Sequence, residues 1–196
     1  GQKMAIGVGD VEVEYIKNRY EEFKELYPYL EFYDKAELAK IEPKIILNSD
    51  GTHRAENVVG MGVKSGEYTT VDYGAFTTTF IENAKKDKSE CDVYLNSRVD
   101  EIYRNGDKFY IQTANGLSIS ADFVVVNAGA HSLYLAHKMG YGLDFGCLPV
   151  AGSFYLTKQK LLNGKVYMVQ NPKLPFAALH GDPDILADGC TRFGPT

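Results

Sequence analysis

The feature that most constrains the fold is the stretch at residues 122–132, Asp-Phe-Val-Val-Val-Asn-Ala-Gly-Ala-His-Ser. The consecutive valines at 124–126 break any alternation of polar and apolar side chains, which predicts a strand covered on both faces, as in a parallel sheet. Small residues follow at 127–130, and an amphipathic helix is expected over residues 132–139. An α/β fold uses a buried strand, a small-residue turn and a helix start to face a dinucleotide. A strand that merely ends in a glycine turn is the alternative interpretation.

Short strands and a helix are expected before this stretch. Asn-Gly pairs at 105–106 and 115–116 are strong hairpin signals, because both residue types tolerate positive φ. They predict a three-stranded meander with a further short strand in front of it; these strands cover residues 92–96, 98–103, 108–113 and 117–120. A helix is expected over residues 72–85, where Phe76 and Phe80 are spaced four apart on one face.

The two ends of the chain mix helices and strands. A helix is expected over residues 11–26, with Asp10 as its N-cap and Pro28 ending it. A second, shorter helix is expected over residues 35–41, capped by Asp34. The remaining segments read as strands or as β-rich, at residues 2–8, 57–63, 146–156, 166–169 and 176–180.

Composition excludes several classes of protein. With 196 residues and 44% hydrophobic residues, the chain can bury a core as one domain or as parts of two. A net charge of −5 without charge blocks makes nucleic acid an unexpected partner. No apolar run reaches the length of a membrane span. The three cysteines lie far apart, which fits a reducing cytoplasm and predicts no metal cluster.

Few side chains are candidates for chemistry. Arg192 is one, because a guanidinium can hold a carboxylate bidentately; an arginine at the surface or paired to a nearby aspartate is the alternative. His180, expected at a strand end before a tight turn, can serve as a base, or can merely cap the turn. His53 is the second candidate base, with a surface loop as the alternative. Asp182 and Asp184 are interpreted as turn formers, and no metal site is expected.

The order of helix, strand, meander and valine-rich strand resembles the second half of the FAD-binding domain in glutathione-reductase-like flavoproteins, more narrowly those of the D-amino-acid-oxidase type. This resemblance implies that the backbone around Val99 contacts the adenine of FAD. It also implies that the turn of Asn127, Ala128 and Gly129 packs against the dinucleotide.

The segments at residues 176–184 and 191–196, together with the opening at 3–10, resemble the malate:quinone oxidoreductases. The resemblance implies an FAD enzyme that oxidises a hydroxydicarboxylate, malate, and passes electrons to membrane quinone from the cytoplasmic face as a peripheral protein. It further implies that Arg192 meets a substrate carboxylate and that Gly194 and Pro195 lie beside the isoalloxazine. The base would then be His180 or His53.

The expected fold is therefore α+β or α/β: part of a glutathione-reductase-like FAD-binding domain with a β-meander, plus a mixed-sheet substrate domain. We expect the substrate domain at residues 1–71 and 146–196, and the FAD-binding part at 72–145. Because Glu12 stands where a Gly-x-Gly-x-x-Gly motif needs its third glycine, we expect a middle segment of a longer flavoprotein that is inactive alone. The alternatives are a 2-hydroxyglutarate or amino-acid oxidase of the same family and an inactive substrate-binding module. The sequence does not predict an oligomeric state.

Overall fold

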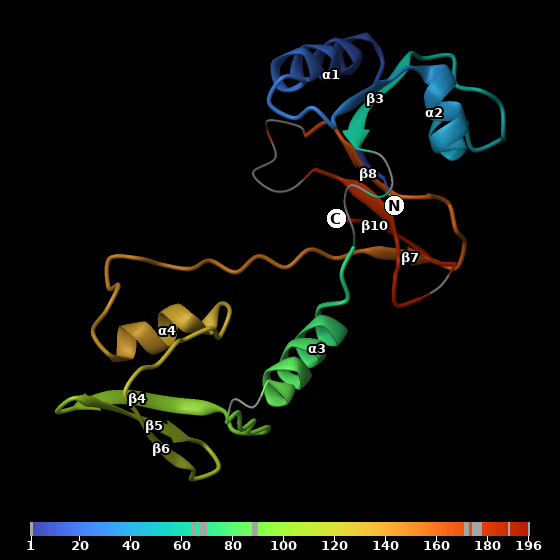
Figure 1. The fold of residues 1–196 in the computed structure, drawn as a ribbon. Coiled ribbons are helices and arrows are strands. Elements are labelled where there is room, and N and C mark those ends of the chain that lie inside the picture. The colour runs from blue at the N-terminus through green and yellow to red at the C-terminus, as the bar shows by residue number, and fades with distance from the viewer. Residues whose placement is uncertain are drawn as a thin grey trace. The chain divides into compact units, whose positions relative to one another are not determined.

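The computed structural model describes residues 2–63, 66, 70–87, 90–170, 173, 178–187 and 189–195. The chain divides into two compact units, Gly1–Phe80 with Gly152–Thr196, and Ile81–Ala151. Each unit is described by itself below, and Figure 1 labels their elements.

The first unit is built on a seven-stranded mixed sheet whose strand order is β2-β3-β1-β8-β9-β10-β7. Its strands are β1 (Lys3–Val8), β2 (Glu31–Tyr33), β3 (Val58–Val63), β7 (Tyr155–Thr157), β8 (Lys165–Met168), β9 (His180–Pro183) and β10 (Thr191–Gly194). β1 pairs with β3 antiparallel and with β8 in parallel, while the other pairs are antiparallel. The strands expected at residues 2–8 and 57–63 are confirmed. The two ends of the chain thus share one sheet.

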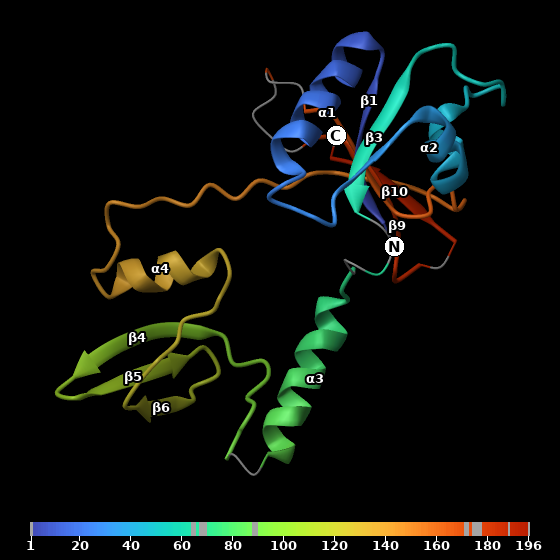
Figure 2. The same cartoon turned by 45° about the horizontal axis from the view of Figure 1, so that its top comes forward.

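Helices cover both faces of the β1 and β3 end of this sheet (Figure 2). On one face α1 (Asp10–Phe23) packs Val13 and Ile16 against Val59. On the other, α2 (Lys35–Ile41) and the 3-10 helix η1 (Pro43–Ile46) cover Met4 and Ile6. The alternation along β1 follows from the two-residue period of a strand, which sends successive side chains to opposite faces.

Local sequence signals predict the start of α2 correctly, but they miss the start and the end of α1. Asp34 forms the expected cap: its carboxylate accepts the Glu37 amide at 2.8 Å, and the Glu37 carboxylate accepts the Asp34 amide at 3.0 Å. Asp10 is not the N-cap of α1. Gly9 takes that place with a φ of 79°, so Asp10 becomes the first helical residue. α1 also ends at Phe23, before Pro28 forces a stop.

The second unit contains the predicted meander. It is an antiparallel sheet of β4 (Val99–Asn105), β5 (Lys108–Thr113) and β6 (Ser118–Ala121), in that order. Gly106 and Gly116 take positive φ values of 60° and 85° in the two turns, as the Asn-Gly signals predict. The helix α4 (His131–Lys138) buries Leu135 and is tied to β4 by Lys138 Nζ, which donates to the Asp100 carbonyl at 2.8 Å.

The strand expected at residues 122–126 is wrong. This segment forms no strand, and Phe123 and Val125 are 78% and 77% exposed. A run of valines is buried on two faces only when neighbouring strands and covering helices are present, and no strand in the described part of the chain pairs with it. Phe123 and Val125 therefore face solvent in this unit, while Val124 and Val126 are half-buried.

Other expected strands are also absent or displaced. The strand expected at residues 92–96 is irregular and ends in a turn in which Asn96 has a φ of 54°. The β-rich segment expected at 146–156 becomes a strand only from Tyr155. The segment expected at 176–180 lies partly outside the described residues, with His180 opening β9. The expected helix at 72–85 is confirmed as α3 (Tyr73–Lys86), with Phe76 and Phe80 in edge-to-face contact at 4.6 Å and no buried residue.

A fully buried carboxylate, Glu42, joins the two ends of the chain within the first unit. It lies between α2 and η1 and accepts the amide of Asn163 at 2.9 Å and the amide of Gly164 at 2.6 Å. The side-chain amide of Gln2 donates to the same carboxylate, and the Asn163 side chain returns a hydrogen bond of 2.8 Å to the Ile41 carbonyl. These contacts satisfy a buried polar group that would otherwise be costly.

Glu42→Ala is expected to lower the free energy of unfolding by about 3 kcal/mol or more, because the amides of Asn163 and Gly164 lose their acceptor in a buried place. Glu42→Gln keeps one acceptor oxygen and is the matched control, with an expected loss of about 1 kcal/mol. Urea unfolding followed by circular dichroism measures both. Equal losses in the two variants would contradict the role of the acceptor.

The same pair of proteins tests a pH effect. Burial raises the pKa of Glu42 above its ordinary value of 4.5, against the opposing effect of the Asn163 and Gly164 amides. The folded state therefore holds this proton more tightly than the unfolded state. The resulting stabilisation is complete below pH 4.5 and is lost as the pH rises through the folded pKa. Across that window the unfolding free energy should fall less in Glu42→Gln than in the unchanged protein.

Candidate functional site

The register of β9 and β10 brings several predicted site residues together. Arg192 lies opposite Asp182, and Gly194 lies opposite His180. His180 is also paired with Tyr167 of β8. Because directly opposite residues share a face of an antiparallel sheet, these pairs gather at one part of the sheet surface. His53 does not join them: it is exposed in the loop after η1 and forms an isolated bridge with Leu47.

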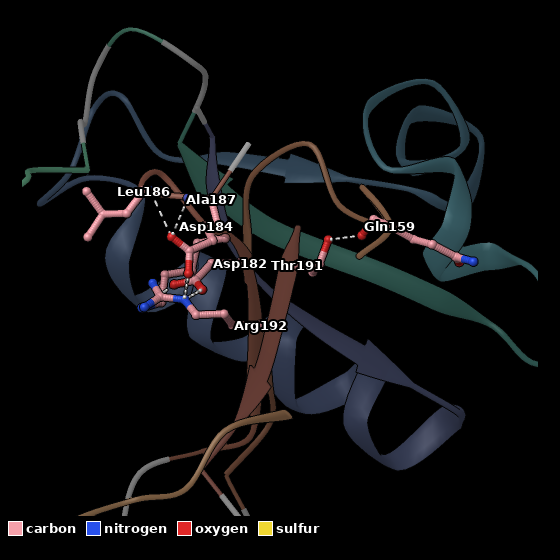
Figure 3. Close-up of polar contacts among 8 residues, drawn as sticks. Gln159, Asp182, Asp184, Leu186, Ala187, Thr191 and Arg192 are labelled. Atoms are coloured by element: carbon pink, nitrogen blue, oxygen red, sulfur yellow. Dashed lines mark hydrogen bonds and ion pairs between the residues drawn. The ribbon is translucent and has the colours of Figure 1, made fainter. Parts of the chain in front are cut away.

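Arg192 is held by two carboxylates (Figure 3). Its Nε lies 3.2 Å from Asp182 Oδ1 and 3.5 Å from Asp184 Oδ2. Asp182 also pairs with Lys165 Nζ at 3.3 Å and is only 12% exposed as a side chain, whereas the Arg192 side chain is 40% exposed. The alternative of an arginine paired to a nearby aspartate is therefore what the structure contains. These ion pairs fix the stem of the guanidinium and leave part of the side chain in solvent.

The two aspartates have different roles. Asp184 Oδ1 accepts the amides of Leu186 at 2.8 Å and Ala187 at 3.2 Å, which confirms it as a turn former (Figure 3). Asp182 is not a turn former, because it lies inside β9 and its carboxylate serves the cations of Lys165 and Arg192. Lys165 and Arg192 on the two neighbouring strands carry charges opposite to that of Asp182, and this attraction is the physical reason for the position of Asp182.

His180 opens β9 rather than ending a strand before a turn. Its ring lies between Tyr167, at 4.8 Å between centroids, and Phe154, at 5.4 Å. Nδ1 lies 3.1 Å from the Ala178 carbonyl, and a carbonyl can only accept, so in the neutral ring this contact assigns the proton to Nδ1. Nε2 then carries the lone pair. The His180 ring can therefore take up a proton at Nε2.

Thr191 is a positioning residue that the sequence analysis missed. It is fully buried beside Arg192, and its hydroxyl donates to the Gln159 carbonyl at 2.8 Å (Figure 3). The same oxygen accepts the Leu161 amide at 2.9 Å. A single threonine thus ties β10 to the loop before β8. Nothing in the local sequence pattern signals this, since the partners lie 30 and 32 positions away.

The residues expected at the flavin occur in both units. In the first, Gly194 is buried, and a Cβ there would lie 2.7 Å from Phe154 Cδ1 and from the Ser153 carbonyl oxygen. Pro195 follows it and is half-buried. The side of Gly194 on which a Cβ would project is therefore already filled by the chain itself.

In the second unit, the small-residue turn is open. Asn127, Ala128 and Gly129 are exposed, and Gly129 has a φ of 57° with no atom within 4 Å of a Cβ built on it. Val99 is half-buried at the start of β4. Exposed backbone without bulky side chains is what a dinucleotide needs for close approach, so this turn fits an FAD contact.

A cavity of about 750 Å³ lies within the first unit. Most of its wall is apolar, from the sheet strands and from η1, while a smaller polar part comes from residues 44–54. His180 and Gly194 are among its lining residues, but Arg192 and His53 are not. The sequence analysis missed this cavity because its wall comes from segments far apart along the chain.

Among the described residues, no three His, Cys, Asp or Glu side chains come together in a way that could hold a metal ion. In the same part of the chain, no helix has the length and apolar character needed to cross a bilayer.

Comparisons with known proteins agree with this architecture. A family model described as malate:quinone oxidoreductase (Mqo) matches residues 2–187. A probable malate:quinone oxidoreductase of Campylobacter jejuni is 61% identical over 197 residues, covering 100% of this chain and 44% of that protein. A malate:quinone oxidoreductase of Helicobacter pylori is 50% identical over 195 residues, covering 100% of this chain and 43% of that protein. The chain thus spans less than half the length of these curated relatives.

Solved structures give the same fold at low identity. Glycine oxidase from Bacillus cereus superposes with a TM-score of 0.68 at 18% identity, over 99% of this chain and 48% of that one. L-Proline dehydrogenase from P. horikoshii superposes with a TM-score of 0.60 at 16% identity, over 100% of this chain and 50% of that one. These likenesses confirm the expected fold class.

The ion pair between Arg192 and Asp182 is expected to stabilise the fold. In a double-mutant cycle of Arg192→Met and Asp182→Asn, the coupling in unfolding free energy should be about 1–2 kcal/mol, because the Asp182 carboxylate is largely buried. The exposed pair Arg98–Asp100, at 3.0 Å, is the matched control and should couple by less than about 0.5 kcal/mol. Chemical unfolding gives both values. Similar couplings in the two pairs would contradict the importance of burial.

Proposed function

The chain belongs to the malate:quinone oxidoreductase family, and from this premise we propose that it is a segment of an FAD-dependent enzyme that oxidises malate to oxaloacetate and passes the electrons to quinone. The observation that carries the proposal is the identity of 61% over the whole chain to a probable malate:quinone oxidoreductase. Because the chain covers 44% of that relative, the activity is proposed for the longer protein, and this segment alone is expected to be inactive.

The proposal divides the segment between two domains. Residues 1–71 and 146–196 belong to the substrate domain, and residues 72–145 belong to the FAD-binding domain. In support, strands from both ends of the chain form one seven-stranded sheet, while the β4-β5-β6 meander makes a sheet of its own.

FAD is the proposed cofactor, and when bound it supplies the acceptor for the hydride that leaves malate. Within this chain, Val99 and the turn of Asn127, Ala128 and Gly129 are proposed to hold the dinucleotide, with Gly194 and Pro195 beside the ring. The open side of Gly129 supports the first set, since nothing lies within 4 Å of its Cβ position. One side of Gly194 is filled by Phe154 and Ser153. Gly194 can therefore contact the ring only from its other side or through its backbone.

His180 is proposed as the base that takes the proton from the hydroxyl group of malate. Its Nδ1 contact with the Ala178 carbonyl holds the ring in one orientation and leaves Nε2 for the proton. The rings of Tyr167 and Phe154 restrict its movement. His53 stays the second candidate, and its exposed loop position offers no comparable restraint.

Arg192 is proposed to bind a carboxylate of malate. The pairs with Asp182 and Asp184 orient its guanidinium through Nε, and the exposed part of the side chain can then meet a substrate anion. The acceptor of the electrons, a quinone, resides in the bilayer. A peripheral position at the cytoplasmic face of the membrane is therefore part of the proposal.

His180→Asn in the full-length enzyme is expected to lower the rate of flavin reduction by malate by about 10²–10⁴-fold, because the hydroxyl proton loses its acceptor. His53→Asn is the matched control and should change the rate by less than about threefold. Stopped-flow absorbance under anaerobic conditions measures both. The opposite ranking would transfer the role to His53.

The function itself is tested by adding malate anaerobically to the full-length protein and following the flavin absorbance. Bleaching is expected, and 2-hydroxyglutarate and amino acids serve as the comparison substrates. If only one of these comparison substrates reduces the bound flavin, that compound replaces malate as the proposed substrate. A protein that purifies without flavin would overturn the proposal.

A further inference from the structure

We propose that Lys165 binds the second carboxylate of malate, so that this lysine and Arg192 together select dicarboxylates; the inference rests on the proposed function. Malate carries a carboxylate at each end of its four-carbon chain, and Arg192 is proposed to bind one of them. A partner for the other must lie on the same face of the sheet as Arg192 and His180, must carry a positive charge and must be accessible to solvent. Lys165 meets these three conditions.

Strand pairing places Lys165 on the face of the sheet that carries the other proposed site residues. Arg192 of β10 lies opposite Asp182 of β9. On the neighbouring strand β8, Tyr167 lies opposite His180. Lys165 stands two positions before Tyr167, and Asp182 follows two positions after His180. Because side chains two positions apart on a strand project from the same face, Lys165, Asp182 and Arg192 form one row across β8, β9 and β10.

The Asp182 carboxylate holds the two cations at its two oxygens. Lys165 Nζ lies 3.3 Å from Oδ2, and Arg192 Nε lies 3.2 Å from Oδ1. The Asp182 side chain is 12% exposed, whereas those of Lys165 and Arg192 are 25% and 40% exposed. The carboxylate is thus the least accessible of the three groups, and a cation reaches solvent on each side of it. A dicarboxylate arriving from solvent can place one carboxylate at each cation.

Both cations keep N–H groups for a second anion. An ammonium group has three N–H donors and a guanidinium has five. Within the described part of the chain, the only carboxylate at Lys165 Nζ is that of Asp182, and the centroid of the Tyr167 ring lies 5.2 Å away. In the same residues, the guanidinium of Arg192 engages Asp182 and Asp184 through Nε. An ion pair and an aromatic ring therefore hold the lysine in place without using all of its donors.

The proposed base lies beside this row of charges. His180 belongs to the next row of the same face, two residues or about 7 Å along β9 from Asp182. Malate carries its hydroxyl group on one of the two carbons between its carboxylates. When the carboxylates are held by Lys165 and Arg192, the hydroxyl group is presented to one side of the row, and His180 lies on such a side. Two fixed anchors orient the reacting carbon better than one.

A purely structural role of Lys165 makes a different prediction. A lysine that only supports Asp182 and Arg192 would, on removal, weaken the binding of every carboxylate alike. A lysine that binds the second carboxylate affects dicarboxylates alone. Succinate and butyrate separate the two cases, because both have four carbons and no hydroxyl group to oxidise, and only succinate has a second carboxylate.

The test uses the full-length enzyme and three substitutions of Lys165. Lys165→Met removes the charge, Lys165→Gln removes it but keeps an N–H donor for Asp182, and Lys165→Arg keeps the charge. Lys108→Met is the matched control, because Lys108 pairs with Asp122 at 3.2 Å in the second unit. Isothermal titration calorimetry gives the Kd of succinate and of butyrate. Turnover of malate with a soluble dye as electron acceptor gives KM and kcat.

We expect Lys165→Met and Lys165→Gln to raise the Kd of succinate and the KM for malate by about 10–100-fold, because a charge-assisted hydrogen bond is lost. The Kd of butyrate and the kcat for malate should change by less than about threefold. Lys165→Arg should return both raised constants to within about fivefold of the unchanged enzyme. Lys108→Met should alter none of these values.

Equal losses for succinate and butyrate in Lys165→Met and Lys165→Gln would overturn the inference, and malate oxidation by the unchanged enzyme would still stand. An unchanged Kd of succinate would overturn it as well. If Lys165→Met does not fold, Lys165→Gln decides by the same criteria, since it keeps a donor for Asp182. An enzyme whose flavin malate does not reduce, but whose succinate binding depends on Lys165 as described, would remove the proposed function and support the dicarboxylate site.

Discussion

The buried carboxylate of Glu42 is the contact on which the first unit depends most. It joins the α2–η1 corner to residues 122 positions later, at the point where the chain enters β8. Without that connection, β8 keeps its pairing with β1 and β9, but the amides of Asn163 and Gly164 just before it lose their buried acceptor. Amide donors supplied from two distant segments offset part of the desolvation cost of the carboxylate. Burial of this group therefore accompanies the pairing of β8 with β1 in the seven-stranded sheet.

The geometry of the candidate site follows from the strand pairing of this sheet. β8 positions β9, and β9 fixes the register of β10, so His180, Asp182 and Arg192 reach their places through strand pairing. Paired charges across β8, β9 and β10 then hold the guanidinium, and Thr191 ties β10 to the loop before β8. A displacement of one residue in β10 would move Arg192 to the opposite face of the sheet.

Local signals in the sequence were sufficient for much of the fold. The Asp34 cap, the Asn-Gly turns and the four-residue spacing in α3 involve neighbours along the chain, and each was predicted correctly. The valine run at 122–126 failed because its burial depends on strands that the described chain does not place beside it. The burial of Glu42 and the cavity escaped prediction for the same reason, whereas the pairing of Arg192 with a nearby aspartate was one of the alternatives that the sequence left open. Both are defined by residues distant in sequence.

The placement of the meander between β3 and β7 also shapes the synthesis of the protein. β1 and β3 leave the ribosome before β8, and the edge of β1 that pairs with β8 has to wait until β8 has been made, roughly 100 residues after β3. At translation rates of about 5–20 residues per second, that interval lasts about 5–20 s. An apolar strand edge exposed for so long can pair with other nascent chains. The meander, which closes through local hairpins, can fold during the wait.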